Sequence, residues 1–577
     1  MSGRRAWLRA ISALAGLALG VLLLRVVLWR PLAVVGEPPD DGFVRVAGVV
    51  HVHTTLSDGG GEPGEVVRAA RAAGLAFLGI TDHNNLDAKP FEGYQDRVLV
   101  LVGAELSTPV GHVLGIGLDR DPAYRFNGDG QDTIDDVLHL GGVPFAAHPF
   151  SARPDLRWGG FELPGPWGLE LLNADSDARR AGPRLLLTAA SYRLNADYAL
   201  LAASGPMAEP LRRWDQLLAA RDVPGLAGAD AHSRLAVTKR LSLRFPSYEA
   251  LFRQARNHVL LERPLLGDAA NDRATVLQAL RSGRFYLGRD ALADASSFSF
   301  TVRDASDRRF AMGDTVEPAA GLRAGAGGRV PAGTRLVLLR DGRTLVEGTA
   351  PLDTALPGAG VYRVEAYVPG WPFPWVLTNP IYVFDAAARA KREAAAAMPG
   401  PPPPPREVQL LSAQAQGATF AAEHDPRSAM DAAVAAPGQS PNGGDALKLA
   451  FELSAPTPTD PFTWCALVNR AERDLGGWTG LRFRARADGE YRLWVQLRDR
   501  NPASADEGLE WWMASARTAL EWSEVQIPFS RLRTLNPRSD GHVDPNETRA
   551  IVFVLDPATV KPGTKGTIWL TDVGVYR

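Results

Sequence analysis

Two histidines and an aspartate stand within eight positions in GVVHVHTTLSDGG, residues 48–60. A β-strand sends residues i and i+2 to the same face, so His51 and His53 should point the same way, with Asp58 in the loop that follows. Neutral imidazoles and carboxylates together bind zinc, manganese or iron. The spacing therefore suggests a metal site, although an HxH pair could also lie by chance on a solvated strand.

Histidines and carboxylates recur where the next predicted strands end, and six of the ten histidines in the chain belong to this set. In parallel barrels these strand ends form the active-site face. A buried histidine with ordinary hydrogen-bond partners would explain any one of these positions, but not all of them together. The set also contains more candidate ligands than a site with one metal ion can use. The residues come from GITDHNN (Asp82, His83), VGAELST (Glu105), GHVLGIG (His112), FAAHPF (His148) and GADAH (Asp230, His232).

Short apolar strands alternate with helical patterns over residues 36–265, which predicts a parallel α/β sheet or barrel. One helix is expected to begin near Pro63, to carry Val66, Val67, Ala70 and Ala73 on one face, and to end at Gly74. The expected strands are Arg45–Val50, Ala76–Ile80, Val98–Gly103, His112–Gly117, Val143–Ala147, Leu169–Leu172 and Gly225–Gly228.

From about residue 266 the pattern changes to one helix, Ala274–Ser282, followed by short strands with Gly/Pro turns, as in a small antiparallel β-sandwich. The low-complexity stretch at residues 386–407 predicts a short helical arm followed by a polyproline spacer. Period-two alternation then predicts another all-β domain. The expected divisions are 1–35 (signal anchor), 36–290 (hydrolase domain), 291–385 (β-sandwich), 386–407 (linker) and 408–577 (C-terminal β-domain).

The N-terminus has three arginines, Arg4, Arg5 and Arg9, before the apolar run Ala10–Leu24, and a second run, Val26–Trp29, follows Arg25. This pattern predicts an N-terminal transmembrane helix that acts as an uncleaved signal anchor; the alternative is a cleaved signal peptide. The flanking arginines favour a single-pass protein of the inner (cytoplasmic) membrane with its bulk outside the cytoplasm. Signal cleavage would instead give a secreted or periplasmic protein.

The net charge and the cysteine count of the chain argue against two classes of function, nucleic-acid binding and thiol catalysis. The formal net charge of −2 gives no global basic field, so there is no strong nucleic-acid signal. The single cysteine, Cys465, excludes an internal disulfide and a Cys-based zinc site, and it lies far along the chain from the histidine motifs. A thiol mechanism therefore has no support.

The motif order HxHT-x2-SDG, TDH, GxE, HxLG, AHP and DxH resembles the PHP (polymerase and histidinol phosphatase) superfamily over about residues 45–290. Within it, the chain is most similar to the exported CehA/McbA-like metallohydrolases. The resemblance implies a distorted (β/α)7 barrel with two or three divalent metal ions, Zn, Mn or Fe. It assigns His51, His53, Glu105 and Asp230 to a first metal, Glu105, His112 and His148 to a second, and Asp58, His83 and His232 to a third.

Within this set we take Glu105 and Asp230 as the catalytic residues. Asp82 is expected to orient a ligand histidine rather than bind metal. Arg153, Arg234 and Lys239 are candidates to neutralise a substrate anion; each could equally be an ordinary surface residue in an Arg-biased chain.

The last domain resembles galactose-binding-like jelly rolls in GLRFRARADGEYRLWVQLRD and GTIWLTDVGVY. Its tryptophans could line a sugar platform, which would make a glycan a partner of this domain, but core packing is the commoner use of tryptophan in such sandwiches. The residues concerned are Trp494, Trp511, Trp512 and Trp522.

Taken together, the sequence predicts a membrane-anchored PHP-type metal-dependent hydrolase with two accessory β-domains. A metal-bound hydroxide would attack a small-molecule phosphoester. The alternatives are an amide, ester or carbamate metallohydrolase, an exonuclease for short nucleic acids, and a non-enzymatic glycan-binding surface protein.

Overall fold

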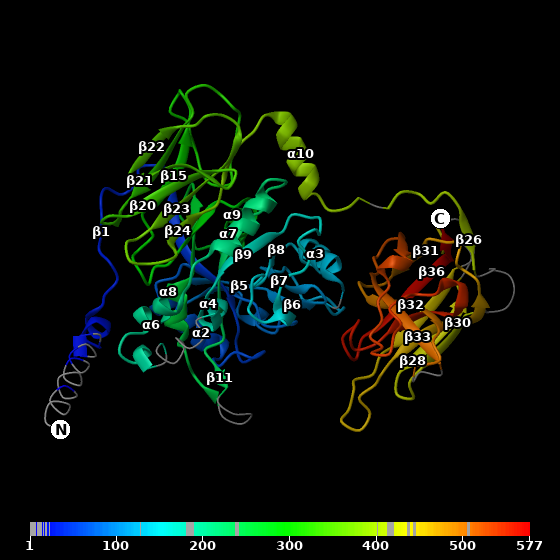
Figure 1. Cartoon of the computed structure of the whole chain (residues 1–577). Coiled ribbons are helices and arrows are strands. Elements are labelled where there is room, and N and C mark those ends of the chain that lie inside the picture. The colour runs from blue at the N-terminus through cyan, green and yellow to red at the C-terminus, as the bar shows by residue number, and fades with distance from the viewer. Residues whose placement is uncertain are drawn as a thin grey trace. The chain divides into compact units, whose positions relative to one another are not determined.

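The computed structural model divides the chain into two compact units (Figure 1): residues 1–119 with 134–398, and residues 120–133 with 399–577. The described residues are all except 1–6, 8–13, 15, 16, 18, 19, 22, 127, 181–187, 189, 237–241, 401, 412–419, 436–438, 442–445 and 505–507.

Nine residues of the apolar run Ala10–Leu24 lie outside the described residues. Over the part of the chain that is described, no helix combines the length and the apolar character needed to cross a bilayer. Residues 23–28 are helical. The chain then joins the first unit, because the backbone N–H of Leu32 donates to the carbonyl of Leu292 at 2.8 Å and β1 (Val34–Val35) pairs with β19 (Val330–Pro331).

Strands in the first unit pair in a circuit that returns to β2. From β2 the pairings run through β3 to β5, which continues through Gly103 into β6, and then through β7, β8, β9 and β10 back to β2. Continuous apolar runs such as VLVLV in β5 suit strands buried on both faces. The bounds are β2 Val44–Val52, β3 Phe77–Ile80, β5 Val98–Val102, β6 Ala104–Thr108, β7 Gly111–Ile116, β8 Val143–Ala146, β9 Gly168–Asn173 and β10 Gly225–Ala231.

The prediction of an all-parallel sheet is wrong at β7, which is antiparallel to both β6 and β8. Only Pro109 and Val110 separate β6 from β7, and so short a connection reverses the chain direction. The other pairs of the circuit are parallel. A multi-domain, strand-rich chain is confirmed, while the finer assignment to a (β/α)7 barrel of PHP type stays a prediction.

Helices follow the sequence signals closely. Pro63 opens α2, Glu62 and Glu65 form a capping box, and Val66, Val67 and Ala70 are buried. The helix predicted from Ala274 begins earlier, at Ala269, because the Asp268 side chain caps it. Besides residues 23–28, the α-helices in the described part of the chain include α2 Pro63–Ala72, α3 Gly130–His139, α4 Ala174–Arg180, α6 Ala196–Ala203, α7 Ala208–Leu218, α8 Tyr248–Gln254, α9 Ala269–Ser282 and α10 Ala386–Ala396.

The predicted small β-sandwich is built from a four-stranded sheet and from strands that continue the sheet of the circuit. The continuity runs through β14, which pairs with β24 and with β13, and β13 pairs with β2. A core of buried apolar residues includes side chains from both sheets. The bounds are β13 Arg256–Leu261, β14 Phe285–Gly288, β15 Phe298–Arg303, β16 Arg309–Phe310, β18 Arg323–Gly328, β20 Arg335–Arg340, β21 Arg343–Thr349, β22 Leu352–Ala355, β23 Gly360–Tyr367, β24 Pro374–Thr378 and β25 Ile381–Val383.

The second unit is a two-sheet β-sandwich with its own apolar core, which confirms the all-β prediction. The jelly-roll, galactose-binding-like assignment stays a prediction. One sheet contains β26 Val408–Leu410, β28 Ala429–Val434, β29 Leu447–Glu452, β31 Gly480–Ala487, β34 Ser523–Pro528 and β36 Lys565–Tyr576. The other contains β27 Ala421–His424, β30 Cys465–Arg473, β32 Arg492–Arg500, β33 Leu509–Arg517 and β35 Thr548–Leu555.

Candidate metal centre

The nine predicted ligands come together at one end of the strand circuit. Each lies in a strand or just after one, so the strand pairings carry residues far apart in the sequence into a single cluster. His51 is in β2, His53 follows it directly, His83 follows β3, Glu105 is in β6, His112 is in β7, His148 follows β8, Asp230 is in β10 and His232 follows it; Asp58 lies in the loop after β2.

Glu105 is the centre of this cluster and is almost completely buried. Its Oε2 lies 3.2 Å from His51 Nε2, 3.1 Å from His53 Nε2 and 3.3 Å from His83 Nδ1. Its Oε1 lies 2.7 Å from His112 Nδ1 and 2.6 Å from His148 Nε2. The two carboxylate oxygens therefore face different imidazoles, as those of a carboxylate shared by two metals would.

The innermost group contains His51, His53, Glu105 and Asp230, all buried, and could hold a metal ion. Asp230 Oδ1 lies 3.4 Å from His51 Nε2 and 3.5 Å from His53 Nε2. Among the described residues, neither of these two nitrogens has a hydrogen-bond partner. Buried polar atoms are normally paired, so an ion at this position would satisfy both. The donor set therefore fits a transition metal.

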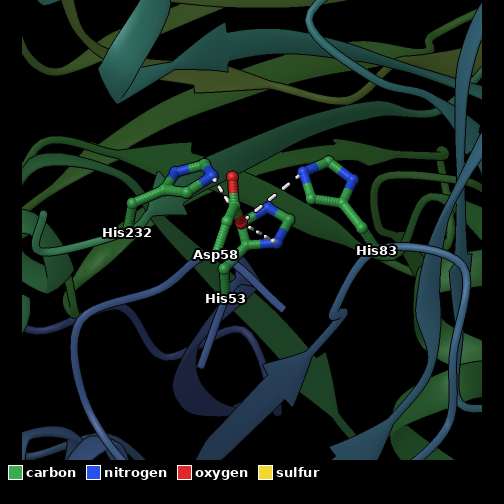
Figure 2. Close-up of side chains that lie close together, drawn as sticks. All are labelled: His53, Asp58, His83 and His232. Atoms are coloured by element: carbon green, nitrogen blue, oxygen red, sulfur yellow. Dashed lines mark ion pairs between the residues drawn. The ribbon is translucent and has the colours of Figure 1, made fainter. Parts of the chain in front are cut away.

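A second group, more open to solvent, contains His53, Asp58, His83 and His232 (Figure 2). Asp58 Oδ1 lies 3.2 Å from His232 Nε2, 3.7 Å from His83 Nε2 and 3.8 Å from His53 Nδ1. This group contains the residues that the resemblance assigns to a third metal, with His53 added. His53 Nδ1 is also buried without a hydrogen-bond partner in the described structure.

A third group contains His83, Glu105 and His112. His148 approaches the same oxygen of Glu105 as His112 does, so the set predicted for the second metal is also brought together. Buried His/Glu/Asp clusters in this protein could therefore hold metal ions, whereas the number of ions, their identity and the role of each residue stay predictions.

The carboxylates and imidazoles of the cluster shift one another's pKa values. Burial alone would raise the pKa of Glu105, but the charge of His51 and hydrogen bonds from His112 and His148 hold that pKa well below its usual range. Burial would lower the pKa of His148, but hydrogen bonding to Glu105 and the charges of Glu105 and Asp230 raise it to about 9. For His232, burial is likewise outweighed by Asp58 and Asp230, and the pKa rises to about 9.

The backbone departs from regular strand geometry at three of the predicted ligands. His51 has φ 63°, His148 has φ 29° and Asp230 has φ 47°, all in the left-handed region that non-glycine residues rarely adopt. The strand register shifts between Val49 and Val52, and between Gly228 and Ala231. Bulges of this kind re-aim side chains, and strained backbone gathers at functional sites. Simple i, i+2 alternation is therefore not what directs His51 and His53 into the cluster.

Glu170, a buried carboxylate in β9, is a site residue that was not predicted from the sequence. Its Oε1 lies 2.8 Å from His51 Nδ1, and its Oε2 accepts hydrogen bonds from the backbone N–H of His148 and from Asn173 Nδ2. A Cβ on Gly228 would lie 1.5 Å from Glu170 Oε1, so only glycine lets β10 pass this close. The signal for Glu170 was a lone acid inside the apolar run GLELLN.

The expectation that Asp82 orients a ligand histidine is wrong. Asp82 accepts hydrogen bonds from the backbone N–H and the hydroxyl of Thr54, both at 2.7 Å, and from the hydroxyl of Ser57. It therefore shapes the loop that carries Asp58. Tyr248 also braces this region: its hydroxyl lies 2.8 Å from the carbonyl oxygen of His53 and 3.1 Å from that of His232.

The predicted anion-binding residues have ordinary partners or lie outside the described chain. Arg153 pairs with the neighbouring Asp155 at 2.8 Å, with both side chains exposed. Arg234 Nη1 donates to the carbonyl oxygen of Asp58 at 3.3 Å, which leaves it beside the cluster. Lys239 lies outside the described residues.

One of the predicted sugar-binding tryptophans is buried in the core, and the other three are partly buried. Trp512 belongs to the apolar core of the second unit. The guanidinium of Arg498 lies 4.0 Å from the ring centroid of Trp511, and that of Arg486 lies 5.6 Å from the ring centroid of Trp522. Trp494 packs partly buried against a smaller apolar cluster. Glycan binding at these residues stays a prediction.

No protein-family model matches the chain. An uncharacterized protein of Methanocaldococcus jannaschii, MJ1587, is 28% identical over 117 residues, which are 18% of this chain and 67% of that protein. This level of identity does not establish a family, so the PHP resemblance depends on the motifs quoted above.

Among solved structures, the chain is similar to carbohydrate-binding β-sandwich modules. A family 11 module from Clostridium thermocellum, in complex with a β-1,3-1,4-mixed-linked tetrasaccharide, is 15% identical with a TM-score of 0.24, covering 29% of this chain and 95% of that one. A family 30 module from the same organism is 16% identical with a TM-score of 0.20, covering 25% and 80%. Likeness this low carries no inference about this chain's ligand.

Proposed function

We propose that this protein is a metal-dependent hydrolase whose substrate is a phosphoester. The observation that carries the proposal is the position of Glu105, whose Oε2 faces His51, His53 and His83 while its Oε1 faces His112 and His148. A carboxylate placed in this way can connect two cations. Two divalent ions held on either side of it would lower the pKa of a bound water towards neutrality and clamp the attacking and leaving oxygens.

The chain's own residues have distinct roles in this proposal. His51, His53 and Asp230 would hold the inner ion, and His112 and His148 the second. Glu170 orients two of these ligands, because it hydrogen-bonds the ring of His51 and the backbone of His148. Partners of this kind fix the tautomer and orientation of a ligand histidine.

Turnover of a panel of chromogenic substrates tests the proposal. Purified full-length protein supplied with Zn, Mn or Fe should hydrolyse phosphomonoesters or phosphodiesters faster than carboxyl esters or carbamates, and a chelator should abolish the activity. Faster turnover of the carboxyl esters or carbamates would replace the phosphoesterase with the amide, ester or carbamate hydrolase. No turnover of any substrate by metal-loaded protein would contradict a hydrolase altogether.

We also propose that the protein acts outside the cytoplasm, on the basis of Arg4, Arg5 and Arg9 before the N-terminal apolar run. A reporter active only outside the cytoplasm, fused after Arg577, should then be active, and the full-length product should stay with membranes through a carbonate wash. A shortened product free in the periplasm would indicate signal cleavage, and reporter activity only in the cytoplasm would contradict the location.

A further inference from the structure

A pocket of about 330 Å³ in the first unit borders two of the strand ends that carry predicted ligands. Phe150, two residues after His148, lines it. Trp158 also lines it, and the next residue, Gly159, donates its backbone N–H to the carbonyl of Val110 at 2.7 Å, just before the strand that carries His112. The proposed chemistry at the metal centre does not use this pocket.

The pocket is rich in positive charge. Arg157, Arg212 and Arg213 line it together with one carboxylate, Glu209. Arg213 already pairs with Glu162 at 3.6 Å, and Arg157 donates to the carbonyl of Ser151 at 2.9 Å. The guanidinium of Arg213 lies 4.3 Å from the ring centroid of Phe161. Arg212 is exposed and makes no hydrogen bond or ion pair with any described residue. Its guanidinium therefore remains available to a ligand.

The pocket also offers flat apolar surface. The rings of Phe150 and Phe161 lie 6.3 Å apart at an interplanar angle of 34°. Trp158 is 3% exposed, and its Nε1–H is a buried donor with no partner in the described part of the chain.

We propose that this pocket binds the non-reacting end of the substrate, and that this end is a flat organic group carrying a second acid, either a carboxylate or a phosphate. Guanidinium groups form charge-assisted hydrogen bonds with both acids, and the aromatic rings pack against a flat group. Binding energy from a non-reacting part of the substrate holds the scissile bond in place. The inference rests on the proposed phosphoesterase function and names its substrate class.

Two phosphonates test the pocket without depending on turnover, because their C–P bond is not a substrate for ester hydrolysis. Phenylphosphonate and 4-phosphonobenzoate differ only in the second acid. Titration calorimetry on metal-loaded full-length protein should show the benzoate binding about tenfold more tightly, roughly the effect of one charge-assisted contact. Equal affinities would overturn the proposal.

Arg212→Ala should remove most of this preference by weakening 4-phosphonobenzoate about five- to tenfold while leaving phenylphosphonate unchanged. Arg212→Lys should restore part of it. The matched control is Arg193→Ala, which should change neither affinity. Arg193 is also exposed and has no partner among the described residues, but it lies outside the pocket lining. An equal effect of Arg212→Ala on both ligands would contradict the assignment.

The outcomes for the pocket and for the proposed function are separable. If metal-loaded protein hydrolyses phosphoesters but binds both phosphonates equally, the pocket assignment fails alone. If it prefers the benzoate through Arg212 but hydrolyses no phosphoester, the pocket assignment holds as an acid-binding site and the proposed reaction fails.

Discussion

At the scale of single residues, Glu105 connects the two halves of the cluster, because each of its oxygens approaches a different set of imidazoles. Asp58, by contrast, approaches only the histidines of the more exposed group, and its side chain is about half exposed. The two carboxylates should therefore differ in how much activity depends on them.

Glu105→Gln should lower kcat/KM by about 10²-fold or more, because loss of a charge shared by two cations removes several kcal/mol of stabilisation. Asp58→Ala should lower kcat/KM by less than about tenfold, since it affects only the outer group. Steady-state kinetics with equal metal loading measures both. Equal residual activities would show that the assignment of the two carboxylates is wrong.

Metal binding should release protons. Burial lowers the pKa values of His148 and His232, but their carboxylate partners raise both to about 9, so at neutral pH the metal-free protein holds these rings protonated. Metal ligation needs the neutral ring, so apparent affinity should rise with pH and level off above the raised pKa values. Calorimetry in buffers of different ionisation enthalpy measures the protons released. Affinity that does not change between roughly pH 7 and 9 would contradict this account.

At the scale of elements, buried strands were the easiest feature to predict, because runs such as VLVLV are continuous and end at turn residues. β6 was not predicted as a separate strand, because only Gly103 separates it from β5. The order of motifs along the chain correctly indicated that the nine residues would meet. It could not indicate Glu170, whose partners come from β2 and β8, nor the left-handed backbone at His51, because both depend on tertiary packing.

Tyr248, the first residue of α8, ties together the loops after β2 and β10 through the carbonyl oxygens of His53 and His232. Tyr248→Phe should lower the free energy of unfolding by about 1–3 kcal/mol, because it leaves the buried carbonyl oxygen of His53 without its side-chain donor. It should also reduce metal occupancy at the outer group. Denaturant unfolding and metal analysis measure the two effects.

Tyr198→Phe is the matched control for that substitution, since the hydroxyl of Tyr198 makes no hydrogen bond with the described residues. It should change the free energy of unfolding by less than about 0.5 kcal/mol, as ordinary substitutions away from such contacts do. Similar losses in both variants would mean that the Tyr248 hydroxyl does not brace the loops.

At the scale of the whole molecule, residues 120–133 belong to the second unit, although the sequence places them inside the hydrolase domain. The N–H of Arg125 donates to the carbonyl of Thr559 at 2.8 Å, and that of Lys561 to the carbonyl of Ala123 at 3.0 Å. Arg531 pairs with Asp129 at 3.1 Å. A polar segment without periodicity gives no sequence signal for such packing.

Removing residues 408–577 should leave kcat/KM for a small soluble substrate within about tenfold of the full-length value, because no predicted ligand lies in that part of the chain. The melting temperature should fall, since Tyr124, 1% exposed within the second unit, would lose its surroundings. A larger loss of activity by protein that remains folded and metal-loaded would show that this domain helps to build the active site.

If the cluster around Glu105 holds more than one metal ion, as we propose, the metal content of the purified protein should show it. Full-length protein produced in medium supplemented with Zn, Mn and Fe should carry at least two transition-metal ions per chain by elemental analysis, because its ligands form more than one group that could hold an ion. His51→Ala and His112→Ala should each lower that number. One ion or none in the unsubstituted protein would contradict the multinuclear centre.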